Sequence, residues 1–175
     1  MDVTDRSRTA VSRRLSRLER EFGDFEHRRI DREYPPGEYE TLVSRFEDGR
    51  LGGAGTWTRN ADGEVLLVRE AKHDAWSEPS GKHEADERFV ETARRETREE
   101  TGVEVAVTDV LRARITTARD ESDPDRPAVV RVMVYFAAEP VGGAAEPQPG
   151  ETEAVTWFDE LPDDLLYDAL RDFPL

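Results

Sequence analysis

The sequence predicts an α/β protein with a mixed β-sheet. Short runs rich in valine, isoleucine, threonine and aromatic residues recur along the chain, as β-strands require. Two amphipathic segments with helical periodicity interrupt these runs at intervals that do not alternate strictly with them. A length of 175 residues fits one compact domain with a terminal segment.

The N-terminal segment predicts an amphipathic helix over residues 8–26. Apolar side chains recur at steps of three and four residues, with charged side chains between them; they are Val11, Leu15, Leu18, Phe22 and Phe25. A proline-rich stretch at residues 33–37 ends this pattern. We therefore divide the chain into an N-terminal helical extension (1–38), packed on the domain or on a second copy of it, and a main domain (39–175).

The main domain is expected to contain several strands and two helices. The predicted strands cover residues 41–46, 54–59, 65–69, 103–117, 129–137 and 155–158, and the predicted helices cover 87–100 and 163–173. The sequence Ala-Asp-Gly at 61–63 suits a hairpin turn between the second and third strands. Polar or Gly/Pro-rich stretches at 120–127 and 140–150 are expected to form loops.

Composition restricts the class of protein. Forty acidic and 25 basic residues give a net charge of −15, which repels nucleic-acid backbones, so no nucleic-acid partner is expected. The acidic excess, with only two lysines, resembles that of halophilic proteins; full stability in dilute buffer would contradict this interpretation. No cysteine is present, and no apolar run is long enough to span a membrane or serve as a signal peptide. We expect a soluble, cytoplasmic protein without membrane partners.

The stretch from Gly81 to Val103, here called the box, carries the chemistry. On a helix, Glu96, Glu99 and Glu100 stand at i, i+3 and i+4 and crowd one face. Like charges at this spacing destabilise a helix unless a cation neutralises them, and Mg²⁺ prefers oxygen ligands. Arg95, beside Glu96 and four residues before Glu99, can orient a carboxylate.

The box resembles the signature of the Nudix hydrolases. That pattern is Gly, five residues, Glu87, seven residues, Arg-Glu, an aliphatic residue, any residue, Glu-Glu, any residue, Gly and an aliphatic residue. Thr97 occupies the aliphatic position, and Ser80 stands just before the box in place of a frequent glycine. The flanking sequences at 76–81 and 156–162 also resemble the family.

This resemblance implies an α/β/α sandwich with a loop–helix–loop catalytic motif. It implies that Glu99 and Glu100 are the main ligands of Mg²⁺, or of Mn²⁺ in its place, and that Glu96 is a further ligand or the general base. Arg95 would orient Glu96, Glu87 would support the site, and the Ser80 carbonyl would contact the metal. A carboxylate outside the box can contribute in relatives, and Glu139 is preferred here over Glu151 and Glu153.

The implied activity is hydrolysis of a diphosphate bond in a nucleoside diphosphate linked to another moiety. Sugar nucleotides such as ADP-ribose are slightly favoured over nucleoside triphosphates, because an extension before the box occurs in dimeric sugar-nucleotide members. Lys82 could touch phosphate and Trp76 could stack a base, although small domains more often place tryptophan in the core. The alternatives left open are a nucleotide-sensing module without catalysis, and a homodimer formed through the N-terminal helix.

Overall fold

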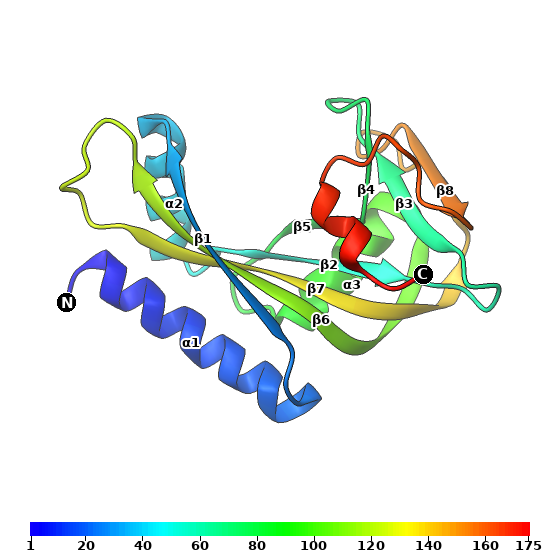
Figure 1. Cartoon of the computed structure of the whole chain (residues 1–175), viewed down its shortest axis with the longest axis horizontal. Helices are drawn as coiled ribbons and strands as arrows, with labels where there is room; N and C mark the ends of the chain where they lie inside the picture. Colours follow the sequence, from blue (N-terminus) through cyan, green and yellow to red (C-terminus); the bar gives the residue numbers. More distant parts are fainter.

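Two sheets and three α-helices build the molecule, and the structure, a computed structural model, describes residues 1–175 (Figure 1). The larger sheet has the order β1-β6-β7-β2-β5 and mixes parallel and antiparallel pairs; its strands are β1 (Glu26–Tyr34), β6 (Val103–Asp120), β7 (Val129–Gly143), β2 (Gly53–Thr58) and β5 (Ser80–Lys82). The smaller sheet is antiparallel, with the order β4 (Trp76–Ser77), β3 (Val65–Arg69) and β8 (Ala154–Phe158). The predicted α/β fold with a mixed sheet is confirmed.

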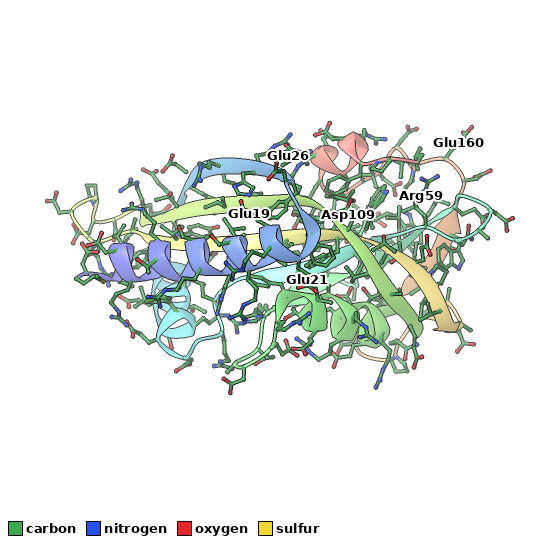
Figure 2. The ribbon with its side chains drawn as sticks, turned by 90° about the horizontal axis from the view of Figure 1, so that it is seen from below. Glu19, Glu21, Glu26, Arg59, Asp109 and Glu160 are labelled. Carbon is green, nitrogen blue, oxygen red and sulfur yellow. The ribbon has the colours of Figure 1, made fainter.

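One face of the larger sheet is covered by helices α1 (Val3–Phe22) and α3 (Phe89–Thr101), which share one hydrophobic cluster. Figure 2 shows the two helices on the same side of the strands, with Glu21 at the end of α1 near α3. Glu21 and Arg88 form an ion pair between them (3.3 Å). The amphipathic N-terminal helix is therefore confirmed, although it runs from Val3 to Phe22, and its apolar side packs on this chain's own sheet.

The prediction of a strand at residues 41–46 is wrong, because these residues lie in helix α2 (Pro36–Glu47). Pro36 stands in the first turn, where the missing N–H costs nothing and the fixed φ favours a helix. The apolar residues Tyr39, Leu42, Val43 and Phe46 follow a helical period and join one cluster at the end of the sheet. The short run 41–46 alone shows too little of this period.

Strand β1 lies within the N-terminal segment and is not predicted by the sequence. It pairs in parallel with β6 along its whole length, from Glu26–Arg112 to Tyr34–Asp120. Eight of its nine residues remain at least partly exposed, so charged side chains mask any hydrophobic alternation. Residues 1–38, which the sequence analysis describes as a helical extension, therefore contribute both α1 and an edge strand of the larger sheet.

The predicted strands at 54–59, 65–69 and 155–158 correspond to β2, β3 and β8. The turn at 60–64 also forms, with Gly63 at φ +85° and its N–H donating to the Asn60 carbonyl (3.0 Å). The hairpin reaches no further than one bridge between Arg59 and Val65, because β2 and β3 then diverge into different sheets.

The closing helix predicted at 163–173 is wrong except for a 3₁₀ turn at Asp168–Asp172. The backbone around Leu165 instead bonds to β4: Trp76 N–H donates to the Asp164 carbonyl (2.9 Å), and Leu166 N–H donates to the Trp76 carbonyl (2.8 Å). A backbone committed to this pairing cannot make helical bonds. Leu170 in this 3₁₀ turn and Phe173 directly after it join Trp57 in the cluster between the two sheets.

The predicted strands at 103–117 and 129–137 are confirmed as β6 and β7, which are longer than expected and pair with three register shifts. No helix in the structure combines the length and the apolar composition needed to cross a bilayer.

Candidate active site

Helix α3 presents the box glutamates, and its ends are fixed by local sequence. At its start Arg88 N–H donates to the Glu91 carboxylate (2.7 Å) in a capping-box arrangement. At its end Gly102 adopts the left-handed conformation (φ +75°), which glycine adopts without a Cβ penalty. The predicted helix and its glycine stop are confirmed, with the helix beginning at Phe89.

Arg95 lies at the centre of the box and holds three of its carboxylates. Its guanidinium donates to Glu87 (2.6 Å), Glu96 (2.7 Å) and Glu99 (3.1 Å). The hydrogen bond from Arg95 is the main cause that lowers the pKa of Glu87 to about 2. The structure therefore brings together four of the residues that the sequence singles out, with the arginine as their common partner.

Glu100 is buried behind these groups. Its Oε2 accepts a hydrogen bond from the Ser80 backbone N–H (3.0 Å), which ties α3 to edge strand β5. Burial is the main cause that raises the pKa of Glu100 to about 9; the neighbouring Glu96, Glu70 and Glu78 act in the same direction, and the Ser80 hydrogen bond opposes them. Ser80 lies in an extended strand, so its Cβ is accommodated where the family often has glycine.

Glu78 is the residue that the sequence analysis misses. It is 2 % exposed, and its Oε2 has no hydrogen-bond partner. Burial raises the pKa of Glu78 to about 7, opposed in part by hydrogen bonds from its own backbone and from Ser80. A sequence signal was present, since Glu78 is an acidic residue enclosed by the Trp-Ser and Pro-Ser pairs of the lead-in to the box.

The donor set suits a hard divalent cation. Carboxylate oxygens are the ligands that such cations prefer, and the orphaned oxygen of Glu78 and the desolvated Glu100 are groups that a cation would stabilise in the charged form. No three acidic or histidine side chains are already arranged to hold a metal ion in the structure, and Arg95 holds Glu96 and Glu99. A cation has to compete with Arg95 for these two carboxylates.

Gly81 is required by the position of Glu96. A Cβ built on Gly81 would overlap the Glu96 carboxylate, which is the movable end of a flexible side chain. We expect Gly81→Ala to fold with little loss of stability but to displace this carboxylate and lower kcat on the order of 100-fold. Circular dichroism and turnover measured on the same preparation check this. Normal turnover of Gly81→Ala would contradict it.

Thr97, the departure from the aliphatic position, is fully buried in a chain of hydroxyl groups. Its Oγ1 donates to the Ala93 carbonyl (2.7 Å) and lies 2.8 Å from Thr56 Oγ1, which in turn lies 2.8 Å from Thr58 Oγ1. Because each hydroxyl has a partner, the polar substitution carries no unsatisfied group into the core.

The remaining predicted site residues lie further from this centre. Glu139 is exposed on β7 opposite Ala106 and makes no ion pair with the box. Trp76 packs edge-on against Phe158 (4.9 Å between ring centroids) with Arg69 over its face. Lys82 donates no side-chain bond, but its carbonyl accepts from Arg95 (3.0 Å), which places it beside the box. Roles for Glu139, Trp76 and Lys82 in the reaction stay predictions.

His83 is buried in the loop of the box. Because Thr92 Oγ1 donates to Glu87 (2.8 Å), we assign the 2.9 Å contact between His83 Nδ1 and Thr92 Oγ1 as a bond from Nδ1–H. Burial lowers the pKa of His83 to about 4; Arg14 and Arg45 lower it as well, while Glu87 and Glu84 oppose them.

The lowered pKa of His83 predicts a loss of stability in acid. The unfolded chain takes up a proton near pH 6.5 and the folded chain only near pH 4, so stability falls as the pH drops through this window. We expect the wild type to lose about 2 kcal/mol between pH 7 and pH 5 relative to His83→Asn, which keeps a donor toward Thr92. Urea unfolding of both proteins at the two pH values measures this difference, and parallel pH curves would contradict it.

Comparison with known proteins agrees with this geometry. The NUDIX domain profile matches residues 49–172. An RNA pyrophosphohydrolase from Halorhodospira halophila (strain DSM 244 / SL1) is 44% identical over 66 residues, which are 38% of this chain and 36% of that protein. The chain thus matches little more than a third of the length of this relative.

Two solved structures share the fold. A NUDIX hydrolase from Nitrosomonas europaea superposes with a TM-score of 0.54 at 22% identity, over 71% of this chain and 67% of the other. A UDP-X diphosphatase superposes with a TM-score of 0.53 at 21% identity, over 94% of this chain and 75% of the other. The chain belongs to the Nudix family, and it carries every charged and glycine residue of the box, with Thr97 at the aliphatic position. Nudix hydrolases generally use divalent metal ions.

Proposed function

We propose that this protein hydrolyses a diphosphate bond in a nucleoside diphosphate linked to another moiety, with Mg²⁺ as its metal ion. The observation that carries this proposal is the arrangement at α3, where Arg95 gathers Glu96 and Glu99 of the helix and Glu87 of the preceding loop beside the buried Glu100. A purely structural helix has no need for three carboxylates around one arginine with a fourth buried beside them, whereas a diphosphate substrate with its cations does.

The residues divide the work as follows. Glu99 and Glu100, with the Ser80 carbonyl and Glu78 behind them, would hold the cation, which when bound neutralises the diphosphate oxygens and activates water. Arg95 keeps Glu96 and Glu99 in place between turnovers and is itself fixed by Glu87 and by the Lys82 carbonyl.

Hydrolysis requires a base close to the diphosphate. The oxygen of one water bonds to phosphorus, the bond from phosphorus to the bridging oxygen breaks, and a carboxylate takes the proton of the water. Glu96, which is half-buried and held by Arg95, is the preferred base. Burial raises the pKa of Glu96 above its usual value, although the hydrogen bond from Arg95 opposes this, and a raised pKa makes the carboxylate a stronger proton acceptor.

For the substrate we keep a preference for ADP-ribose and other sugar nucleotides over nucleoside triphosphates. The name of the Halorhodospira relative adds 5′-triphosphorylated RNA to the compounds to test. The net charge of −15 argues against tight binding of a long nucleic acid, although not against a short 5′ end.

The test is a panel of substrates with the wild-type protein in Mg²⁺ at high salt. ADP-ribose, a UDP-sugar, a nucleoside triphosphate, a dinucleoside polyphosphate and a short 5′-triphosphorylated RNA would be compared by release of phosphate or monophosphate. Turnover of one class supports the proposal and identifies the substrate. Tight nucleotide binding without turnover would instead support a nucleotide-sensing module.

A homodimer through α1 is a separate proposal about assembly. The apolar side of α1 is already used against β6 and β7, so a second copy would have to contact its polar outer side, which carries Ser12, Arg13, Ser16, Arg17 and Arg20. Light scattering that returns the monomer mass of 19.9 kDa would reject it.

A further inference from the structure

A cavity of about 250 Å³ lies between α2, the end of β1 and the start of the box. Its walls come from segments far apart in the sequence; they are Tyr34, Gly37, Glu38, Thr41, Leu42, Arg45, Leu51, Gly52, Lys82 and Arg131. Its volume lies below the range of roughly 300–1,000 Å³ that is typical of sites for whole drug-sized ligands. The cavity therefore suits a small group.

The charge of this cavity opposes that of the rest of the protein. Three cationic side chains, Arg45, Lys82 and Arg131, line it with a single carboxylate, Glu38. One of the two lysines of the chain is among them, in a protein with a net charge of −15. A local excess of positive charge in an acidic protein favours binding of an anion.

Arg131 is the clearest sign of a missing partner. Its neighbours in sequence on β7, Val130 and Val132, pack into the core beneath α1 and α3, whereas Arg131 projects from the opposite face of the sheet into the cavity. It forms no hydrogen bond or ion pair, although the chain contains 40 acidic residues. Burial lowers the pKa of Arg131, and the nearby Arg114 and Arg32 lower it further, so a bound anion would relieve both effects.

The other cationic groups are equally without acidic partners. Arg45 donates only to backbone carbonyls, those of Arg50 (2.7 Å) and His83 (2.9 Å), which orient its guanidinium without neutralising it.

The first turn of α2, with Gly37 and Glu38 in the cavity wall, has no side-chain cap. Its free N–H groups and the helix dipole add to the positive potential.

Lys82 connects this cavity to the box. Its side chain lines the cavity, while its backbone carbonyl accepts a hydrogen bond from Arg95 Nη2 (3.0 Å). The adjacent His83 is bonded at its carbonyl by Arg45 and at its N–H by the Gly52 carbonyl (3.0 Å). Lys82 of the β5 edge thus contacts both the cavity and Arg95.

We propose that the cavity is a phosphate-binding site in which Arg131, Lys82 and Arg45 hold a phosphate group beside the box. A phosphate offers several oxygens to a guanidinium, which binds such groups through two parallel N–H···O bonds. The phosphate belongs either to a substrate with a phosphate beyond the scissile diphosphate or to free inorganic phosphate. The choice between these two sources rests on the proposed function, whereas the presence of the site does not.

The first experiment measures binding without catalysis. Inorganic pyrophosphate is titrated calorimetrically into the full-length protein in EDTA, at the lowest salt at which circular dichroism shows a folded chain. We expect Arg131→Gln to weaken binding about 10-fold or more, and Arg131→Lys to weaken it less. The matched control Arg13→Gln removes the same charge from the exposed outer side of α1 and should bind as the wild type does.

Because Arg131 is half-buried, Lys82→Gln provides a second variant at an exposed side chain, where misfolding is not a concern. It too should weaken pyrophosphate binding. Absence of binding to the wild type, or equal affinities for the wild type, Arg131→Gln and Lys82→Gln, would overturn the proposal. These outcomes do not depend on whether the protein is an enzyme.

The second experiment identifies the source of the phosphate. With the substrate found in the panel and Mg²⁺, Arg131→Gln should raise KM about 10-fold or more if the cavity holds a phosphate of the substrate. An unchanged KM together with lost pyrophosphate binding would assign the site to free phosphate. If the wild type hydrolyses nothing, the proposed function fails while the binding experiment still decides on the site.

Discussion

Glu99→Gln is expected to lower kcat/KM by at least about 100-fold on the substrate identified in the panel. Glutamine keeps the shape and one carbonyl oxygen of the side chain but removes the negative charge that attracts a divalent cation. The side chain of Glu99 is 49% exposed, and its carboxylate contacts Arg95. Its substitution therefore leaves the core unchanged. Initial rates at several concentrations of substrate and of Mg²⁺ measure the effect.

Glu91→Gln is the control for this variant. It removes the same charge from the same helix, and glutamine can still accept the capping hydrogen bond from Arg88 N–H. We expect its kcat/KM to stay within about twofold of the wild type. If Glu99→Gln and Glu91→Gln have equal activity, the assignment of Glu99 to the metal site is wrong.

Trp57→Ala is expected to cost about 3–5 kcal/mol in the free energy of unfolding. Trp57 is 1% exposed, contacts Phe173 edge-on (5.4 Å between ring centroids) and donates from Nε1 to the Pro174 carbonyl (2.7 Å). Alanine would leave a cavity between the two sheets and free the C-terminal segment, which closes this cluster. Urea unfolding at high salt, with the m-value fitted, measures the loss.

Trp57→Phe separates packing from the hydrogen bond. It retains most of the aromatic contact with Phe173 but removes the indole donor, so a loss of about 1–2 kcal/mol is expected. A cost below about 1 kcal/mol for Trp57→Ala would show that this cluster does not hold the sheets together.

The sequence by itself determined the parts of the protein whose pattern is local. The box specifies α3, its glycine stop and the glutamates around Arg95, because spacing on one helix fixes which side chains share a face. The core strands β2, β3, β6, β7 and β8 and the helix α1 are likewise visible, since each carries enough apolar residues at its own period. The family follows from the same local pattern.

The tertiary structure alone decided features that depend on neighbours distant in sequence. Strand β1 is polar and forms only because β6 offers a free edge, and residues 163–167 do not form a helix because their backbone bonds to β4. Glu78 gains its significance from burial beside Glu100, and Arg131 from facing a cavity formed by α2 and Lys82. Burial and local electric field are sums over surroundings that no single segment encodes, so these residues could be identified only in the folded chain.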